Sequence, residues 1–422
     1  MYGGTRSRVY QSFKIFLFHF RLSIINYSLL LRLIYFLFVK LLVLSSRFPY
    51  PLEKGDKLRI YHQLRHLNKS HEVFLVALTD EEISTEHFEK VKEVVSHLEV
   101  FKLKKHKRGF SLLKSVFSRT PFQVAVYYSS VIHEKVRKIA RAFRPDHIYC
   151  QLTRMSEYAK DLPFPKTLDY MDAFGVGMQR RADVVSLPMS LIFKLEANRM
   201  KKYESNIYNF FDHHTVISDQ DKHHIETPKE NEIVVVRNGI DTDFFSPNEK
   251  EKVFDIGFVG NMGYPPNVDA AEYLINTLKP KLNQNLRYQI AGARPDKRVK
   301  LLAGKNVTIT GWVDDVRNAY SCCKIFVAPL WSGTGQQNKI LEAMAMGIPC
   351  ITSSSVNNAI GAQHEKEILV ADTQEEIVDC VERLTNDVQI YMELKENALM
   401  FVRENYSWKQ SVEILTALFE ES

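Results

Sequence analysis

The sequence predicts an α/β protein with two successive domains, each built on a parallel sheet that helices cover on both faces. Short β-rich runs alternate with amphipathic stretches along most of the chain. A turn-rich, charged segment at residues 237–252 interrupts this alternation and is typical of an interdomain linker. The length of 422 residues suits two domains, or three. Apolar residues make up 45% and charged residues 25%, which excludes disordered, collagenous and disulfide-scaffold classes.

The first domain is placed at residues 39–236, from seven apolar runs separated by amphipathic stretches. Strands are expected at Lys40–Leu44, Glu72–Ala77, Leu98–Lys102, His147–Cys150, Lys166–Asp169, His214–Ile217 and Ile233–Val236. Helices are expected at Lys57–Leu67, Thr85–His97, Val131–Arg144 and Pro188–Tyr208. Strand and helix in alternation indicate a parallel sheet, because parallel strands need long crossover connections.

The second domain is placed at residues 237–404 and repeats the alternation. Its strands are expected at Asp255–Val259, Arg287–Ala291, Val307–Thr310, Ile325–Ala328 and Cys350–Thr352. Two helical patterns, Gln374–Arg403 and Trp408–Glu420, close the chain. Residues 405–422 are expected to form a C-terminal helix that packs back on the first domain.

Residues 1–38 form an apolar N-terminal extension with three open interpretations. It is a dispensable extension ahead of a fold that begins near Val39, a membrane-associating segment, or an integral part of the fold. Arg32 lies inside the apolar stretch, where a charge near the middle of a spanning helix costs about 2.5–3.5 kcal/mol. A cleaved signal peptide is disfavoured, because the apolar region is too long and no small-residue cleavage site follows.

Cysteine and charge content exclude further classes. The five cysteines form no CxxC and no zinc spacing, so they are expected to be small buried residues in a reducing compartment. Lys and Arg outnumber Asp and Glu by 56 to 50, too small an excess to argue nucleic-acid binding. The basic run Lys102–Arg108 is either a solvated loop or a contact with an anionic membrane surface. No nucleic-acid-binding fold accompanies it.

The segment Phe326–Ser353 predicts a strand, a glycine-bearing loop, a helix and a further strand. Gly333 and Gly335 in the loop allow close approach of backbone to a ligand. Gly347 and Pro349 are expected to end the helix. In such a unit the free N–H groups at the start of the helix favour a phosphate.

Lys339 and Glu342 are three residues apart in this helix and share one face. A cation beside a diphosphate and a carboxylate that accepts from sugar hydroxyls would suit one nucleoside-diphosphate ligand. The alternative is a helix with an ordinary Lys–Glu surface pair next to a glycine turn.

Glu342-Ala343-Met344-Ala345, followed by Met346–Pro349, resembles the signature of the group 1 glycosyltransferases, the large family four of retaining sugar transferases. The resemblance implies the GT-B fold, in which two Rossmann-like α/β domains face each other across a cleft. Further matching segments are Ser46–Pro51 with Lys54–Lys57, Val236–Asp241, Phe258–Met262, Ile290–Gly292 and Thr310–Val313.

The resemblance also implies site residues. Glu342 would bind the ribose of the donor, whereas Thr334 stands where the family has its first Glu. The loop Gly333–Lys339 is similar to that of sugar transferases associated with exopolysaccharide gene clusters. The expected donor-binding residues are Gly260, Asn261, Arg294, Gly333, Thr334, Gly335, Gln336, Gln337, Lys339 and Glu342. The expected catalytic residues are Gly55, Asp172 and Lys339.

The function implied is transfer of a sugar from a nucleoside-diphosphate sugar, UDP- or GDP-linked, to a hydroxyl acceptor that is a glycan, a lipid-linked precursor or a polysaccharide precursor. The reaction is expected to be retaining and metal-independent, with no other cofactor. Asp241-Thr242-Asp243 matches a metal motif formally but lies in the linker. The expected location is cytoplasmic, at the inner face of the membrane, with peripheral contact through Lys102–Arg108 or the N-terminal extension and no nucleic-acid partner.

Two alternatives remain open: a sugar-nucleotide epimerase of the same fold, and a non-catalytic partner in a polysaccharide assembly complex that binds the nucleotide sugar. A dinucleotide oxidoreductase is disfavoured, because Gly260 and Gly263 do not complete GxGxxG.

Overall fold

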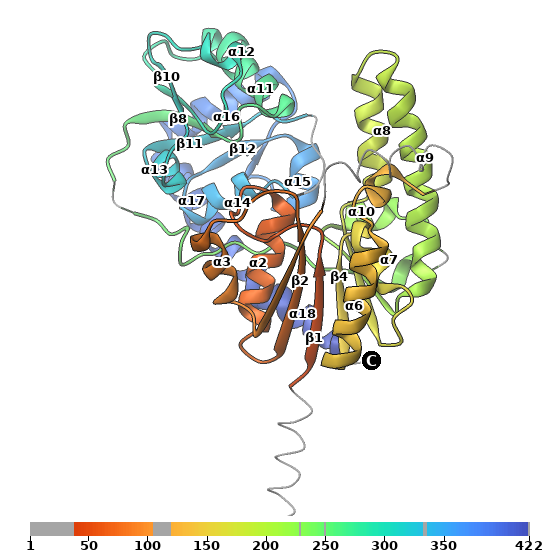
Figure 1. Cartoon of the computed structure of the whole chain (residues 1–422). Coiled ribbons are helices and arrows are strands. Elements are labelled where there is room, and N and C mark those ends of the chain that lie inside the picture. The colour runs from red at the N-terminus through yellow and green to blue at the C-terminus, as the bar shows by residue number, and fades with distance from the viewer. Residues whose placement is uncertain (1–37, 104–119, 228, 249, 332–335, 421–422) are drawn as a thin grey trace, which may run out of the picture.

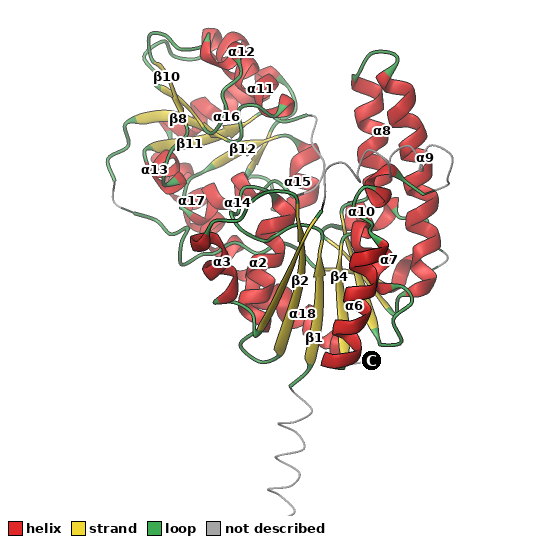
Figure 2. Ribbon diagram, in the orientation of Figure 1, coloured by secondary structure: helices red, strands yellow, loops and turns green. Residues whose placement is uncertain are grey.

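The computed structural model describes residues 38–103, 120–227, 229–248, 250–331 and 336–420. The chain forms two lobes, each with a parallel sheet between helices (Figures 1 and 2). The first lobe holds a seven-stranded sheet and the second a six-stranded sheet. The predicted α/β class is confirmed.

The seven-stranded sheet has the order β3-β2-β1-β4-β5-β6-β7. Its strands are β1 (Lys40–Ser45), β2 (Glu72–Thr79), β3 (His97–Lys102), β4 (His147–Gln151), β5 (Lys166–Met171), β6 (His213–Val216) and β7 (Ile233–Val235). Leu41, Leu42, Val43 and Leu44 of β1 are fully buried, as expected for a strand covered on both faces.

Helices cover both faces of this sheet, and one pair projects beyond it. They are α2 (Gly55–Leu67), α3 (Thr85–Lys92), α5 (Phe122–Ala125), α6 (Ser130–Phe143), α7 (Ser156–Ala159), α8 (Phe174–Val184), α9 (Met189–Ile207) and α10 (Asp219–His224). The helices α8 and α9 pack side by side in a hairpin that rises from the first lobe (Figure 1). Helix α8 was not predicted from the sequence, because it contains Gly175 and Gly177, two residues of low helix propensity.

The six-stranded sheet has the order β10-β9-β8-β11-β12-β13. Its strands are β8 (Phe254–Val259), β9 (Tyr288–Ala291), β10 (Val307–Gly311), β11 (Cys323–Ala328), β12 (Cys350–Thr352) and β13 (Leu369–Val370). The helices of this part of the chain are α11 (Pro265–Glu272), α12 (Lys297–Lys300), α13 (Val316–Ser321), α14 (Asn338–Ala345), α15 (Ser354–Ile360), α16 (Gln374–Asn386), α17 (Val388–Asn405) and α18 (Trp408–Glu420). The two-residue strand β13 was not predicted.

The helical pattern Gln374–Arg403 is two helices rather than one. Asp387 separates α16 from α17, and its side chain accepts hydrogen bonds from the backbone N–H groups of Gln389 and Ile390. This is N-cap geometry, in which a carboxylate satisfies the free donors at the start of a helix.

The C-terminal helix α18 lies against the first lobe. Leu415 and Phe419 belong to the same buried cluster as Ile60 and Leu64 of α2. The start of α18 crosses the linker at close range. A Cβ on Gly239 of the linker would lie 2.3 Å from the backbone nitrogen of Trp408, the first residue of α18. Only glycine fits this crossing without displacing α18.

Three sets of earlier predictions concern residues outside the described part of the chain: the N-terminal extension to residue 37, the basic run from residue 104 to 108, and the loop residues Gly333, Thr334 and Gly335. Within the described residues, no helix combines the length and the apolar character needed to cross a bilayer. All five cysteines are free, and all but the half-buried Cys322 are buried.

Candidate active site between the two lobes

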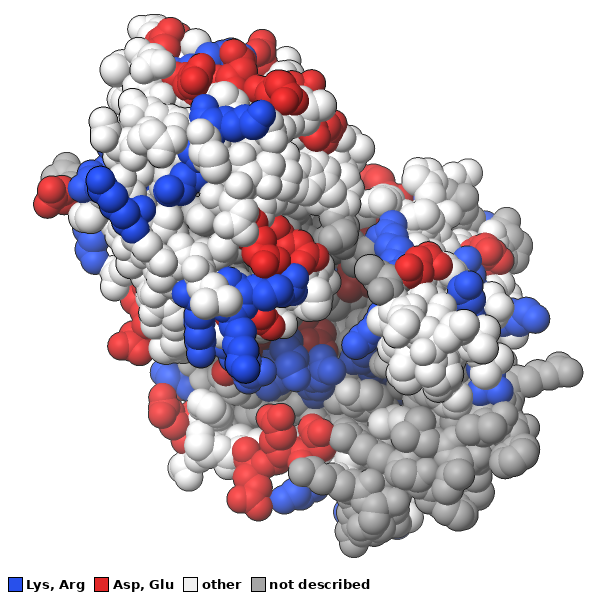
Figure 3. Space-filling model, turned by 90° about the horizontal axis from the view of Figure 1, so that it is seen from above, with Lys and Arg blue, Asp and Glu red and all other residues white. Residues whose placement is uncertain are grey.

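Both sheets contain a point where the order of the strands reverses direction. In the first lobe it lies between β1 and β4, and in the second between β8 and β11. Loops that leave adjacent strands at such a point diverge to opposite faces, so a crevice opens at the carboxyl ends of the strands, and ligands of α/β proteins bind there. A hollow separates the lobes in the space-filling view, and Lys and Arg side chains gather beside it (Figure 3).

The loop after β8 forms one wall of the second lobe's crevice. Gly260 and Asn261 begin this loop, and the side chain of Asn267 in α11 donates a hydrogen bond to the Asn261 carbonyl at 2.9 Å. Gly292, at the end of β9, has a φ of 141°, and a Cβ there would lie 1.7 Å from the Gly260 carbonyl oxygen. The two strand ends therefore approach so closely that backbone, not side chain, lines this part of the loop.

The first turns of α14 bring a cation and a carboxylate to the same place. Lys339 Nζ donates to Asn267 Oδ1 at 2.5 Å and lies 5.5 Å from the centre of the Phe258 ring. Burial lowers the pKa of Lys339 to about 8, although the nearby Glu342 acts in the opposite direction. Glu342 Oε2 accepts from the Tyr320 hydroxyl at 2.7 Å, and burial raises the pKa of this carboxyl. Gly260, Asn261, Lys339 and Glu342 are thus brought together.

Other predicted donor-binding residues occupy different positions. Gln336 binds the linker: its Oε1 accepts from the Asn238 N–H at 3.1 Å, and its Nε2 donates to the Asn238 carbonyl at 2.9 Å. Gln337 is the residue before α14 and makes no side-chain cap. Arg294 follows β9 with an exposed side chain and a left-handed φ of 54°. Gln336 therefore joins the donor loop to the linker, and its contact with a donor stays a prediction.

The catalytic residues predicted in the first lobe lie on segments that follow the carboxyl ends of β1 and β5. Gly55 is the first residue of α2, and a Cβ there would contact Met171 at 3.4 Å. Asp172 follows β5 directly and is half-buried. Burial, with the charge of Asp221 nearby, raises the pKa of Asp172 to about 7.

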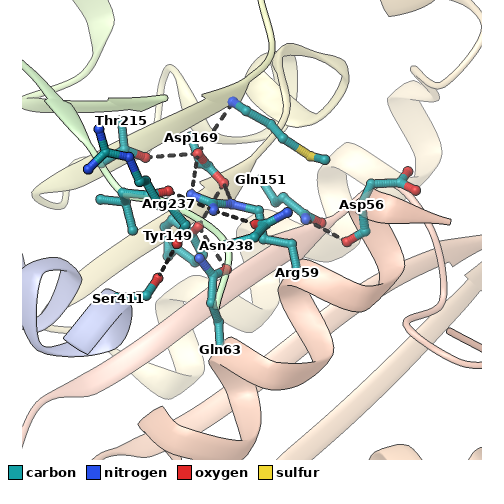
Figure 4. A network of polar contacts seen from close by, with 12 residues as sticks. Asp56, Arg59, Gln63, Tyr149, Gln151, Asp169, Thr215, Arg237, Asn238 and Ser411 are labelled. Atoms are coloured by element: carbon teal, nitrogen blue, oxygen red, sulfur yellow. Dashed lines mark hydrogen bonds and ion pairs between the residues drawn. The ribbon is translucent and has the colours of Figure 1, made fainter. Parts of the chain in front are cut away.

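A buried ion pair joins α2 and β5 in the first lobe, and sequence reasoning missed it (Figure 4). Arg59 of α2 donates to both carboxylate oxygens of Asp169, at 2.7 and 3.1 Å, and both side chains are fully buried. The same guanidinium donates to the Val236 carbonyl and to Asn238 Oδ1, each at 2.8 Å. Thr215 donates to Asp169 at 2.9 Å. The pair therefore ties α2 and β5 to the linker, so Asp169 acts as a structural anchor.

No cluster of His, Cys, Asp or Glu in the described ranges has the arrangement of a metal site. Asp241, the first residue of the formal metal motif, accepts from Arg65 at 3.0 Å and from the Phe244 N–H at 3.1 Å. It thus fixes the linker against α2.

Residues 253–387 match the family model of the group 1 glycosyl transferases. This part of the chain is a group 1 glycosyl transferase domain. The chain is accordingly a glycosyltransferase, as its sequence signature predicts.

Known proteins resemble the chain over different lengths. A protein of 44.6 kDa in the cps region of Klebsiella pneumoniae, itself uncharacterized, is 23% identical over 412 residues, which cover 91% of this chain and all of that protein. The UDP-Gal:α-D-GlcNAc-diphosphoundecaprenol α-1,3-galactosyltransferase of Escherichia coli is 28% identical over 185 residues, 37% of this chain and 46% of that enzyme.

Solved structures with the GT-B fold superimpose on nearly the whole glycosyltransferase. Sucrose-phosphate synthase from Thermosynechococcus elongatus has a TM-score of 0.66 at 14% identity and covers 90% of this chain and 98% of its own. HepE from Anabaena, in complex with UDP and glucose, has a TM-score of 0.67 at 12% identity and covers 91% of this chain and all of its own. At this identity the likeness establishes the fold, and the GT-B prediction is confirmed.

Proposed function

We propose that this glycosyltransferase moves a sugar from a UDP-linked donor to a hydroxyl acceptor in the synthesis of a surface polysaccharide. The observation that carries the proposal is the position of Lys339, a half-buried cation at the reversal point of the second sheet that donates its hydrogen bond to the neutral amide of Asn267. UDP and glucose in the HepE complex and the UDP-Gal named for the Escherichia coli enzyme support a UDP-linked donor. The cps region of the Klebsiella relative supports a role in polysaccharide synthesis.

Donor binding would use the loop after β8 and the start of α14. The Lys339 ammonium and the free N–H groups of α14 bind the diphosphate, and they stabilise the charge that develops on it when the bond from the anomeric carbon to phosphate oxygen breaks. Glu342 accepts hydrogen bonds from the ribose hydroxyls, and Arg294 approaches the diphosphate from the end of β9. The protein itself, through this set of residues, supplies the positive charge that leaving-group departure needs. No metal ion takes part.

Acceptor activation would take place on the first lobe. Gly55 leaves the start of α2 open to the acceptor, and the Asp172 carboxylate accepts a hydrogen bond from the attacking hydroxyl. The departing phosphate takes the proton of that hydroxyl, and the new bond retains the configuration at the anomeric carbon. Closure of the lobes excludes water, because hydrolysis of the donor competes with transfer. A lipid-linked acceptor would place the enzyme at the cytoplasmic face of the membrane.

Calorimetric titration of UDP tests the donor site. Lys339→Met is expected to weaken the affinity for UDP by about tenfold or more, because a charge-assisted hydrogen bond to phosphate is lost. The matched control is Lys297→Met, which removes an exposed lysine of α12. Equal affinities for UDP in Lys339→Met and the control would contradict the proposed donor site.

Product analysis tests the reaction. Incubation with UDP-sugar and a lipid-linked acceptor is expected to give an α-linked product by NMR and to continue in the presence of EDTA. Loss of transfer with EDTA would contradict metal independence, and an inverted product would contradict retention. An isomerised donor formed without acceptor would identify an epimerase instead, and donor binding without any turnover would identify a binding partner.

A further inference from the structure

Two arginines that were not predicted as site residues meet at the reversal point of the first sheet. Arg47 lies two residues after β1, and Arg154 lies in the short helical turn that follows β4. Because β1 and β4 are parallel neighbours, the segments that leave their carboxyl ends begin side by side. Arg47 and Arg154 thus stand on the first lobe where ligands of α/β proteins bind.

The two guanidinium groups share one close carboxylate. Arg47 Nη1 lies 2.5 Å from Asp56 Oδ2, and Arg154 Nη1 lies 4.0 Å from the same oxygen. Arg154 Nε and Nη2 donate to Gln123 Oε1, a neutral acceptor, at 3.2 and 2.8 Å. Asp172 is a second acidic group near Arg154, and burial raises the pKa of its carboxyl to about 7. Within 4.0 Å, the two guanidinium groups thus share the single carboxylate of Asp56.

The positive charge of the two arginines is partly withdrawn from water, which makes it costly unless an anion compensates it. The side chains of Arg154, Asp56 and Arg47 are only 11%, 10% and 29% exposed. Burial, together with the Arg47 charge, lowers the pKa of Arg154. A buried cation without a full counter-charge is destabilising for the protein alone, so such a group is typical of a site that a ligand completes.

Aromatic rings hold Arg154 in place. Its guanidinium carbon lies 5.1 Å from the centre of the Tyr127 ring and 4.9 Å from that of Phe174, the first residue of α8. Stacking of this kind holds the plane of the guanidinium in one orientation. The N–H donors of a guanidinium held in this way match the oxygens of a phosphate. The N-terminus of α2, one residue before Asp56, adds free backbone N–H groups to the same cluster.

We propose that Arg47 and Arg154 bind the phosphate of a phosphorylated acceptor, so that the substrate glycosylated by this enzyme is a sugar or alcohol carried on a lipid phosphate or diphosphate. The inference deepens the proposed function and rests on it, because it assumes that the hollow between the lobes holds an acceptor. A neutral oligosaccharide would leave the two arginines with Asp56 as their shared carboxylate and would add no second negative charge.

The test is calorimetric titration of the full chain in saturating UDP, which keeps the donor site filled. The probes are farnesyl diphosphate, inorganic pyrophosphate and farnesol. Farnesyl diphosphate and pyrophosphate are expected to bind, and farnesol is expected to bind at least about tenfold more weakly than farnesyl diphosphate. Binding of pyrophosphate but not of farnesyl diphosphate would overturn the assignment to a lipid-carried acceptor.

Variants that remove either a positive or a negative charge from the cluster extend the test. Arg47→Gln and Arg154→Gln are each expected to weaken farnesyl diphosphate binding by about tenfold or more, since each loses a charge-assisted hydrogen bond. Asp56→Asn is expected to tighten it, because the competing carboxylate charge is removed. The control is Arg137→Gln, in which an arginine of α6 paired with Asp161 is lost. Unchanged affinity in the more exposed Arg47→Gln would overturn the proposal even if Arg154→Gln folds poorly.

Titration of UDP into the same variants separates this inference from the proposed function. UDP affinity is expected to stay within about twofold of the parent in Arg47→Gln, because Lys339 and α14 are untouched. If UDP fails to bind the parent protein while the arginine variants still lose pyrophosphate binding, the donor assignment fails and the anion site stands. If UDP binds and the arginine variants behave like the parent toward farnesyl diphosphate, only this inference fails.

Discussion

The pKa of Lys339 predicts that affinity for UDP falls steeply above neutral pH. Burial lowers the pKa of this lysine to about 8 in the free protein, well below the ordinary value of 10.5. A diphosphate beside the ammonium favours the charged form, so the pKa rises when UDP binds. Affinity is therefore full where the free lysine is already charged, below pH 8, and is lost as the pH rises through that value.

The magnitude follows from the fraction of charged lysine. With a pKa of about 8, roughly nine-tenths of Lys339 is charged at pH 7, half at pH 8 and about one-tenth at pH 9. If only the ammonium form binds the diphosphate, the dissociation constant for UDP rises about tenfold between pH 7 and pH 9. The phosphates of UDP contribute little to this change, because a phosphate monoester loses its second proton near about pH 6.

Isothermal titration of UDP at pH 7, 8 and 9, in buffers of different ionisation enthalpy, measures both the affinity and the protons taken up. Lys339→Met is expected to bind weakly with a flat pH profile, and Lys297→Met is expected to keep the slope of the parent. The same affinity at pH 7 and pH 9 in the parent would refute the reasoning, and so would an equal slope in Lys339→Met.

Three further predictions concern stability, each measured by thermal unfolding followed by circular dichroism. Asp169→Asn leaves the fully buried Arg59 without its counter-charge and is expected to destabilise the protein by about 3–5 kcal/mol; a change under about 1 kcal/mol would contradict a buried pair. Gly239→Ala places a Cβ 2.3 Å from the backbone nitrogen at the start of α18, so the free energy of unfolding is expected to fall by about 1–3 kcal/mol and α18 is expected to be proteolysed faster. Resistance to proteolysis equal to that of the parent would argue against this close crossing. Leu415→Ala removes a fully buried side chain of α18 and is expected to cost about 2–5 kcal/mol, whereas Ile414→Ala, 43% exposed, is expected to stay within about 0.5 kcal/mol; equal effects would mean that α18 does not pack as described.

Local patterns in the sequence were enough to predict the positions of most of the strands. The apolar runs at residues 40–44, 72–77 and 350–352 each lie within or coincide with an observed strand, because a buried parallel strand needs a short continuous apolar run. The failures also have local causes. β13 is too short to give a pattern, α8 begins with residues of low helix propensity, and the break at Asp387 lacks a glycine or proline.

Part of the donor site could also be predicted from the sequence. Lys339 and Glu342 are three residues apart on one helix, so their shared face follows from helical geometry alone. Their pairing with Asn267 and Tyr320 does not, because those residues lie on α11 and α13 and come close only when the second sheet is assembled. The family signature identified the helix, and the fold supplied its partners.

The sequence by itself thus determined the fold class, the positions of nearly all strands along the chain and the helix that carries Lys339, since each depends on residues close together in the chain. Tertiary structure alone decided that Arg59 pairs with Asp169, that Gln336 binds the linker, and that Arg47 meets Arg154. The physical reason is that the order of strands in a parallel sheet depends on the paths of the crossover connections. Those paths bring together side chains that are far apart in the chain, and no local periodicity records which ends will be neighbours.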